Sequence, residues 1–101
     1  MKTFKDLEFK ELSAHKLDAK RAKLFFNNGY GVSVVSGALF YTTENAPYEL
    51  AVIRKTDNDV DFIINVGGYL TEEEVTQIMR NIQITNTLLY KTLNGVGEWN
   101  L

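Results

Sequence analysis

The chain has 101 residues, of which 45% are hydrophobic and 24% are charged, and its formal net charge is −2. This length suits one hydrophobic core, so we expect a single domain over residues 1–101, and the composition excludes a disordered chain. The chain has no cysteine, which excludes disulfides, thiolate metal sites and a cysteine nucleophile. It also lacks an N-terminal apolar run and any segment of membrane-spanning length, so we expect a cytoplasmic protein.

The N-terminal part contains one segment with strand character and one that is ambiguous. Residues 6–12 alternate partly between polar and apolar side chains, which favours a first strand. Residues 14–26 are compatible with a strand that forms a hairpin with residues 30–35, because Asn28-Gly29 is a strong two-residue turn signal. The same residues are also compatible with a helix that Asn28-Gly29 ends. We favour the hairpin.

A second hairpin is predicted in the middle of the chain. Residues 48–53 and 60–64 are rich in β-branched and aromatic side chains, and they flank a polar turn at residues 55–59. The pair Gly67-Gly68 follows the second of these strands. We expect this pair to let the chain turn sharply from the sheet into a helix, because glycine adopts conformations that other residues avoid.

The sequence YLTEEEV predicts the start of that helix. Thr71 is the expected N-cap, and Glu74, three residues later, completes a capping box. Leu70 and Val75 are expected to form the hydrophobic staple around this cap. Beyond it, apolar residues recur at every third or fourth position, which predicts one amphipathic helix over residues 72–83.

Together these elements predict an α+β fold. Its core is an antiparallel β-sheet of about four to five strands, with one C-terminal amphipathic helix packed on a face. The alternative is a ferredoxin-like α/β sandwich, in which residues 14–26 are helical and residues 84–90 form the last strand. The conformation of residues 84–101 stays open between helix and strand.

Residues suited to catalysis or metal binding are scarce. His15 is the only histidine, so it would have to serve every serine-type mechanism as the general base. Residues 57–61 begin like a calcium loop, but Phe62 and Gly68 stand where the glycine and the bidentate glutamate are required. The glutamates in the first turn of the predicted helix oppose phosphate binding there. We therefore expect no enzyme activity, no metal and no cofactor.

Aromatic side chains exceed what one small core needs, and tyrosine and tryptophan are frequent anchors in protein interfaces. The aromatics in question are Tyr30, Phe40, Tyr41, Tyr48, Tyr69, Tyr90 and Trp99. Each of them can also be a core residue. The candidates for contact with a protein partner are Tyr30, Phe40, Tyr41, Tyr48 and Trp99.

Four stretches of the chain, taken in order, resemble a known group of proteins. They are DLEFK at residues 6–10, NGYGVSVV at 28–35, YELAV at 48–52 and YLTEEEV at 69–75. In this order and spacing they resemble short, mostly uncharacterised accessory proteins of tailed bacteriophages. The resemblance covers a family-like core at residues 1–84 and leaves residues 85–101 as a C-terminal extension. It implies expression inside an infected bacterium and brings no catalytic residues.

The leading functional hypothesis is a non-enzymatic phage accessory protein that binds and modulates a host protein, such as a defence component, in the cytoplasm of the infected bacterium. The first alternative is a sponge for a small ligand or nucleotide signal, with its pocket at the interface of a homo-oligomer. The second alternative is a weak binder of single-stranded nucleic acid that uses Tyr30 and the basic residues of the N-terminal quarter. The net acidic charge disfavours nucleic acid as a partner, and no membrane partner is expected.

Overall fold

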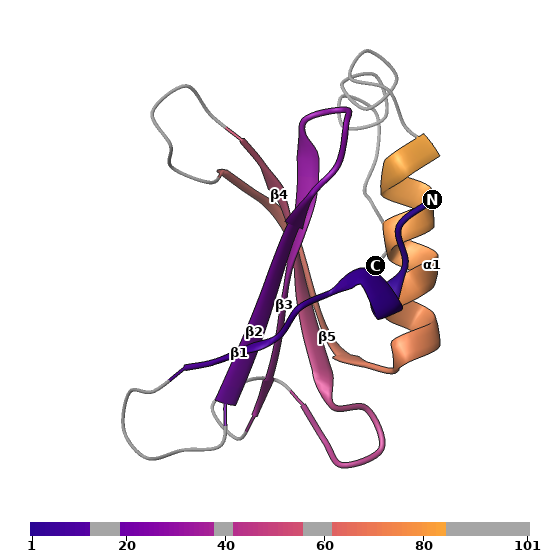
Figure 1. Ribbon diagram of the computed structural model, residues 1–101. Helices are drawn as coiled ribbons and strands as arrows, with labels where there is room; N and C mark the ends of the chain where they lie inside the picture. Colours follow the sequence, from indigo (N-terminus) through magenta and orange to yellow (C-terminus); the bar gives the residue numbers. More distant parts are fainter. Residues whose placement is uncertain (13–18, 38–41, 56–61, 85–101) are drawn as a thin grey trace.

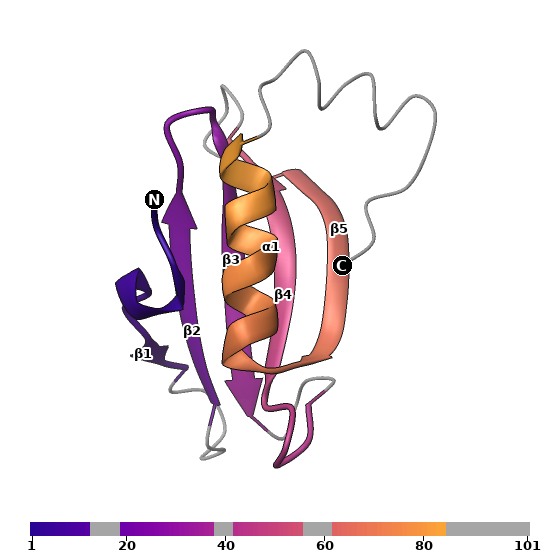
Figure 2. The same cartoon turned by 90° about the vertical axis from the view of Figure 1, so that its right-hand side faces the viewer.

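The fold is an antiparallel sheet that carries a helix on one face (Figures 1 and 2). The computed structural model describes residues 1–12, 19–37, 42–55 and 62–84. Within these residues the sheet has five strands in the order β1-β2-β3-β4-β5, so that every strand pairs with its neighbours in sequence. The elements in chain order are the 3-10 helix η1 (Phe4–Asp6), β1 (Lys10–Glu11), β2 (Ala19–Phe25), β3 (Tyr30–Gly37), β4 (Tyr48–Arg54), β5 (Phe62–Leu70) and α1 (Glu72–Ile84).

This architecture confirms the predicted α+β fold with an antiparallel sheet and a C-terminal helix. The ferredoxin-like alternative is wrong, because residues 19–25 form strand β2 and not part of a helix. The first strand is shorter than predicted, since only Lys10 and Glu11 pair with β2. Just before it, the Thr3 backbone N–H donates to Asp6 Oδ2 at 2.8 Å. This bond supports a local turn, η1, in which Asp6 cannot be part of a strand.

The hairpin between β2 and β3 is confirmed, but its turn differs from the prediction. The Phe26 N–H donates to Tyr30 O at 2.7 Å, and the Gly29 N–H donates to Phe26 O at 3.1 Å. Gly29 has a φ of 86°, whereas Asn28 has no positive φ. The loop is therefore longer than two residues, with glycine alone in the left-handed region. Asn28 instead ties the turn to the helix, because its Nδ2 donates to Ile82 O at 2.9 Å.

Strand β5 runs further than predicted and contains two irregularities. One lies near Ile64 and the other between Gly67 and Leu70, and each inserts an extra residue relative to β4. The strand continues through Gly67-Gly68, so the expectation that this pair forms the turn into the helix is wrong. The left-handed residue here is Tyr69, with a φ of 57°. Figure 2 shows β5 curving along the outer side of the sheet as it approaches α1.

The N-terminus of α1 has the predicted cap. The Glu74 N–H donates to Thr71 Oγ1 at 3.2 Å, and the Thr71 N–H donates to Glu74 Oε1 at 3.0 Å. Leu70 and Val75, the predicted staple pair, are both buried in the main hydrophobic cluster. The helix continues to Ile84, one residue past the predicted end. The predictions for residues 85–101 lie outside the described part of the chain.

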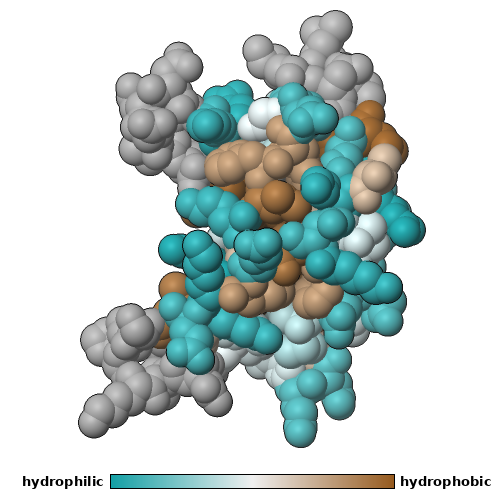
Figure 3. Space-filling model, in the orientation of Figure 1, coloured by the Kyte–Doolittle hydropathy of each residue, from teal (hydrophilic) through white to brown (hydrophobic). Residues whose placement is uncertain are grey.

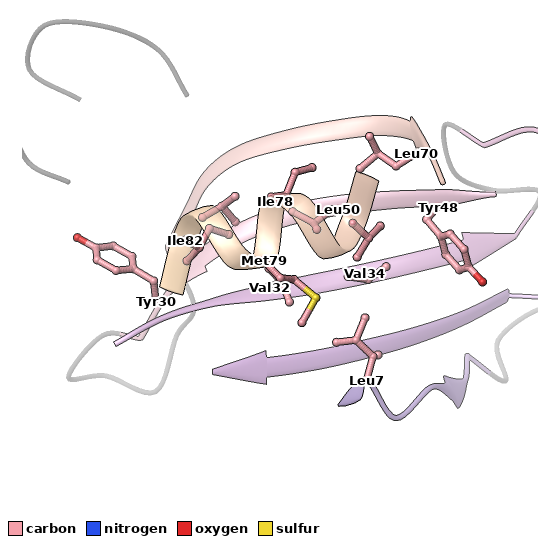
Figure 4. Close-up of a cluster of buried hydrophobic side chains, with 13 residues drawn as sticks. Leu7, Tyr30, Val32, Val34, Tyr48, Leu50, Leu70, Ile78, Met79 and Ile82 are labelled. Carbon is pink, nitrogen blue, oxygen red and sulfur yellow. The ribbon is translucent and has the colours of Figure 1, made fainter. Parts of the chain in front are cut away.

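The core lies between α1 and the sheet (Figure 4). One stripe of the helix, made of Val75, Ile78, Met79 and Ile82 as the spacing predicts, is buried. It packs on alternate residues of the central strands, which are fully or almost fully buried: Tyr30, Val32, Val34, Leu50 and Val52. The helix thereby covers one face of the sheet (Figure 2).

The N-terminal segment, residues 1–12, lies across one side of the helix, and we call it the N-terminal strap. Lys2 and Gln83 exchange two hydrogen bonds: the Lys2 N–H donates to Gln83 Oε1 at 2.8 Å, and Gln83 Nε2 donates to Lys2 O at 2.6 Å. The Phe4 N–H donates to Thr76 Oγ1 at 3.1 Å. The strap therefore holds the C-terminal end of α1 at Gln83, next to Ile82, to which Asn28 attaches the β2–β3 turn.

Under the strap, Tyr48 belongs to an aromatic cluster. Its ring meets that of Phe4 edge-on, with the two ring centroids 5.0 Å apart, and its centroid lies 5.8 Å from that of Phe9. Burial, and secondarily the negative charge of Glu72, raises the pKa of the Tyr48 hydroxyl above its usual value. The folded protein therefore favours the neutral phenol more strongly than the unfolded chain does.

We expect Tyr48→Phe to reduce the loss of stability at alkaline pH. Below about pH 10 the phenol is neutral in both states, so the raised pKa adds no pH dependence. Above that pH the unfolded phenol ionises while the folded one stays neutral, and the free energy of unfolding falls until the folded pKa is passed. Urea denaturation of both proteins between about pH 8 and pH 11 measures this difference. Equal alkaline losses in the two proteins would contradict it.

Candidate functional site

Two of the five predicted partner-binding aromatics are core residues. Tyr30 is 1% exposed and Tyr48 is 9% exposed, so neither is an exposed anchor. Both lie on the helix-facing side of the sheet, in register with the other core residues of β3 and β4. Burial of Tyr30 also removes it from the surface that the nucleic-acid hypothesis needs. Phe40, Tyr41 and Trp99 lie outside the described residues.

Exposed apolar side chains gather instead on β5. Of the large exposed hydrophobic residues in the described part of the chain, three belong to this strand: Ile63 is 59% exposed, Val66 48% and Tyr69 54%. We call these three residues the β5 surface. Within the described sheet β5 is an edge strand that pairs with β4 alone. Its sequence, FIINVGGYL, contains no charged residue.

The other edge of the sheet is built differently. Strand β1 is two residues long, and both of its residues, Lys10 and Glu11, are charged and exposed. Figure 3 views the molecule from this side and shows hydrophilic residues surrounding the hydrophobic patches. Short, charged edge strands are a common protection against pairing with another chain. Within the described residues, the β5 edge has neither the short length nor the charged side chains of the β1 edge, although two bulges interrupt it.

The sheet face opposite α1, which we call the open face, changes in character from β2 to β5. The pairing register aligns Lys23, Ser33, Ala51 and Val66 in one row across four strands. This row begins with a charged residue on β2, crosses two small residues and ends with an exposed valine. Ile63 continues the apolar side on β5 toward the start of that strand. The β5 surface therefore extends onto a sheet face of mixed character.

Tyr69 combines exposure with an unfavourable backbone conformation. Its φ of 57° lies in the left-handed region, where a side chain with a Cβ costs about 1–2 kcal/mol. The two residues before it are glycines, which would adopt this conformation without that cost. Strain of this kind often accompanies a functional position, because stability alone would select glycine there. Tyr69 is therefore the strongest single candidate for a contact residue.

We expect Tyr69→Gly to be more stable than Tyr69→Ala, by about 1 kcal/mol, because only glycine relieves the left-handed strain. At an ordinary strand position the order is the reverse, since glycine weakens a strand relative to alanine. Guanidinium denaturation of the two variants measures the difference, and both remove the same aromatic ring. If the alanine variant is the more stable of the two, the strain assigned to Tyr69 is wrong.

Sequence reasoning did not select this surface. The sequence pattern places Tyr69 among the surplus aromatics but not among the candidate contacts, and it indicates neither Ile63 nor Val66 as a contact residue. The signal that could have found them is the complete lack of charge over residues 62–70. The turn predicted at Gly67-Gly68 ends the strand too early and hides this signal.

Among the described residues, no group of three or more histidine, cysteine, aspartate or glutamate side chains is placed to hold a metal ion. A depression between the strap and β2 is lined by residues of mixed charge: Glu8, Lys10, Glu11, Leu12, Arg21 and Lys23. Such a surface offers no single charge that would recognise a ligand. The predictions of no cofactor and no enzyme activity remain predictions.

Comparisons of the chain with protein-family models, with curated proteins and with solved structures found no match. In the part of the chain that the structure describes, no helix is long and apolar enough to cross a membrane. The resemblance to phage accessory proteins therefore stays a prediction, as do the hypotheses that follow from it.

Proposed function

We propose that this protein is a non-enzymatic binding module whose protein partner contacts the β5 surface. The observation that carries the proposal is the concentration of exposed apolar side chains, Ile63, Val66 and Tyr69, on one uncharged edge strand. Contiguous exposed apolar side chains on a small domain often mark a site of protein interaction. Tyrosine in particular is enriched among the residues that dominate binding energy.

The dimensions of this region suit a protein partner. A nine-residue strand is about 30 Å long. Together with the open face beside it, this length can supply the roughly 800 Å² per partner that a stable protein interface needs. A small ligand would instead need a concave site lined by a few convergent polar groups. The β5 surface is a strand edge beside the open face of the sheet, which favours the protein partner.

The setting of this activity follows from the resemblance to phage accessory proteins. We propose that the partner is a protein of the infected bacterium, such as a defence component, and that binding takes place in the host cytoplasm. The protein would act by occupying a surface of that partner, since the leading hypothesis assigns it no reaction of its own.

Affinity capture with matched variants tests this proposal. The tagged chain, the double variant Ile63→Lys/Val66→Lys and the control Ile84→Lys are each used to capture proteins from a lysate of the bacterial host. Ile84 is 68% exposed but lies at the end of α1, away from β5 in sequence. We expect the wild-type chain and the control to enrich the same protein at least about tenfold over the double variant, which corresponds to a loss of about 1.4 kcal/mol.

Two results would contradict the proposal. One is that no host protein is enriched by the wild-type chain. The other is that the double variant, shown by circular dichroism to be folded, captures the same proteins as the wild-type chain. In the second case the partner contacts a different surface of the molecule.

A further inference from the structure

We infer that Asn28 is a site of spontaneous deamidation, and that this reaction irreversibly releases the C-terminal end of α1 from the β2–β3 turn. The site is separate from the β5 surface and does not depend on the proposed function. Asparagine followed by glycine is especially prone to deamidation, because glycine has no side chain that hinders attack by its backbone nitrogen. Asn28-Gly29 is such a dipeptide, and the Asn28 side chain amide is bonded to α1.

The reaction needs only the chain itself and water. The backbone nitrogen of Gly29 loses its proton to a base in solution and attacks Cγ of Asn28. A new C–N bond closes a five-membered succinimide ring. The bond from Cγ to Nδ2 breaks, and the side-chain nitrogen takes up a proton and leaves as ammonia. Water then opens the ring at either carbonyl and gives aspartate or isoaspartate, with no oxidation or reduction.

Solvent reaches this dipeptide. Gly29 is exposed, and apart from its chain neighbours no atom of the described residues lies within 4 Å of the position of a Cβ there. Asn28 is partly exposed and lines a surface depression at the end of α1, together with Met1, Phe26, Asn27 and Gln83. The base and the water that the reaction needs are therefore available at the turn.

Three hydrogen bonds oppose the reaction while the turn is attached to α1. The Gly29 N–H, which must lose its proton, donates to Phe26 O at 3.1 Å. The Asn28 side chain is held at both ends, because Nδ2 donates to Ile82 O at 2.9 Å and Oδ1 accepts from the Tyr30 N–H at 3.1 Å. Cγ cannot turn toward the attacking nitrogen until these bonds break. The reaction therefore proceeds from the fraction of molecules in which the turn has separated from α1.

The product cannot restore the bond to α1. Deamidation replaces the Nδ2 donor by a carboxylate oxygen, which is only an acceptor. This oxygen would face the carbonyl of Ile82 at the C-terminal end of the helix, where the helix dipole disfavours an anion. The last turn of α1 has no basic residue that would offset the charge. Opening of the turn thus permits the reaction, and the reaction prevents the turn from closing again.

Peptide mapping by mass spectrometry, on the full chain incubated in buffer at neutral pH, tests the site. The reference is the same chain incubated in urea, where it is unfolded. We expect Asn28 to convert at least about tenfold more slowly in the folded chain, as a site does that reacts from a locally open state. Equal rates would show that α1 does not restrain Asn28. Protection beyond about 10⁴-fold, the range for reaction after global unfolding alone, would show that the folded protein has no such site.

Two variants of α1 test the role of the helix without altering the dipeptide. Gln83 holds the last turn of α1 to the strap through its two bonds with Lys2, whereas Gln77 donates to Asn81 Oδ1 on the same helix. Gln83→Ala should loosen the last turn and speed the conversion of Asn28 by about threefold or more, in line with the loss of one or two hydrogen bonds. Gln77→Ala should leave the rate unchanged. The same rate in both variants would overturn the control by α1.

Asn28→Asp supplies one product directly, and Asn27→Asp is its matched control because it adds the same charge to the neighbouring, exposed residue. We expect Asn28→Asp to speed amide hydrogen exchange in the last turn of α1 by at least about tenfold, with little change in the control. Equal exchange in the two variants would overturn the release of α1. The incubation of the wild-type chain tests the site even if Asn28→Asp does not fold. None of these measurements uses a partner, so their failure is distinguishable from failure of the proposed function.

Discussion

Met79→Ala is expected to lower the free energy of unfolding by about 2–5 kcal/mol, the range for truncating a large buried side chain. Met79 is 0% exposed and lies in the main cluster between α1 and the central strands (Figure 4). Truncation of its side chain leaves a cavity between the helix and the sheet, and these elements can relax into it only partially. A domain of this size has only about 5–15 kcal/mol in total, so the variant should lose a large part of its stability.

Urea denaturation measures this loss, with two controls on the same helix. Met79→Leu keeps the volume and should cost less than about 1.5 kcal/mol. Ile84→Ala changes an exposed residue and should alter stability by less than about 0.5 kcal/mol. A cost below about 1 kcal/mol for Met79→Ala would mean that α1 does not pack on the sheet as described.

Gly31→Ala is expected to cost about 1–3 kcal/mol or more, because it forces atoms into an occupied space. A Cβ at this position would overlap the carbonyl oxygen of Leu24 and lie 2.8 Å from Cδ1 of Phe25. The Phe25 side chain therefore lies against the bare backbone of Gly31 on the open face. In the same row, Ile53 is only 2% exposed although no helix covers it. Gly31 thus allows the ring of Phe25 to cover part of the open face.

Gly29→Ala is the matched comparison, since it separates crowding from backbone strain. Nothing lies within 4 Å of a Cβ at Gly29, but its φ is 86°. The variant should cost only the strain of a left-handed alanine, about 1 kcal/mol. Denaturant midpoints of the two variants give the order directly. A larger loss for Gly29→Ala than for Gly31→Ala would contradict the close approach of Phe25.

The parts of the fold that were predictable depend on neighbouring residues. The cap of α1 requires only Thr71 and Glu74, three residues apart, and both hydrogen bonds are present. The β2–β3 hairpin follows from the turn residues around Gly29, although a chain pattern cannot distinguish a two-residue turn from a longer loop. The buried stripe of the helix follows from its spacing. In each case the decisive interaction lies within a few positions along the chain.

The parts that were not predictable depend on partners far along the chain. The glycines at 67 and 68 look like a turn, but Gly67 pairs with Leu50 of β4, the strand continues to Leu70, and the left-handed residue is Tyr69. Tyr30 and Tyr48 look like surface aromatics, but the sheet register turns both toward the helix. The candidate site was missed for the same reason, since the exposure of Ile63 and Val66 depends on which strand ends the sheet.

The bond between Lys2 and Gln83 links residues 81 positions apart and so has a consequence for synthesis on the ribosome. The strands can pair in the order in which they emerge, because each one neighbours the next in sequence. The strap emerges first, but it can form its hydrogen bonds to the helix only after α1, which emerges last, has been synthesised. Until Ile82 has left the ribosome, the apolar face around Val32 and Leu50 has no cover. A chain truncated before this point would expose the apolar face of its sheet. It would therefore aggregate and would not form a smaller functional protein.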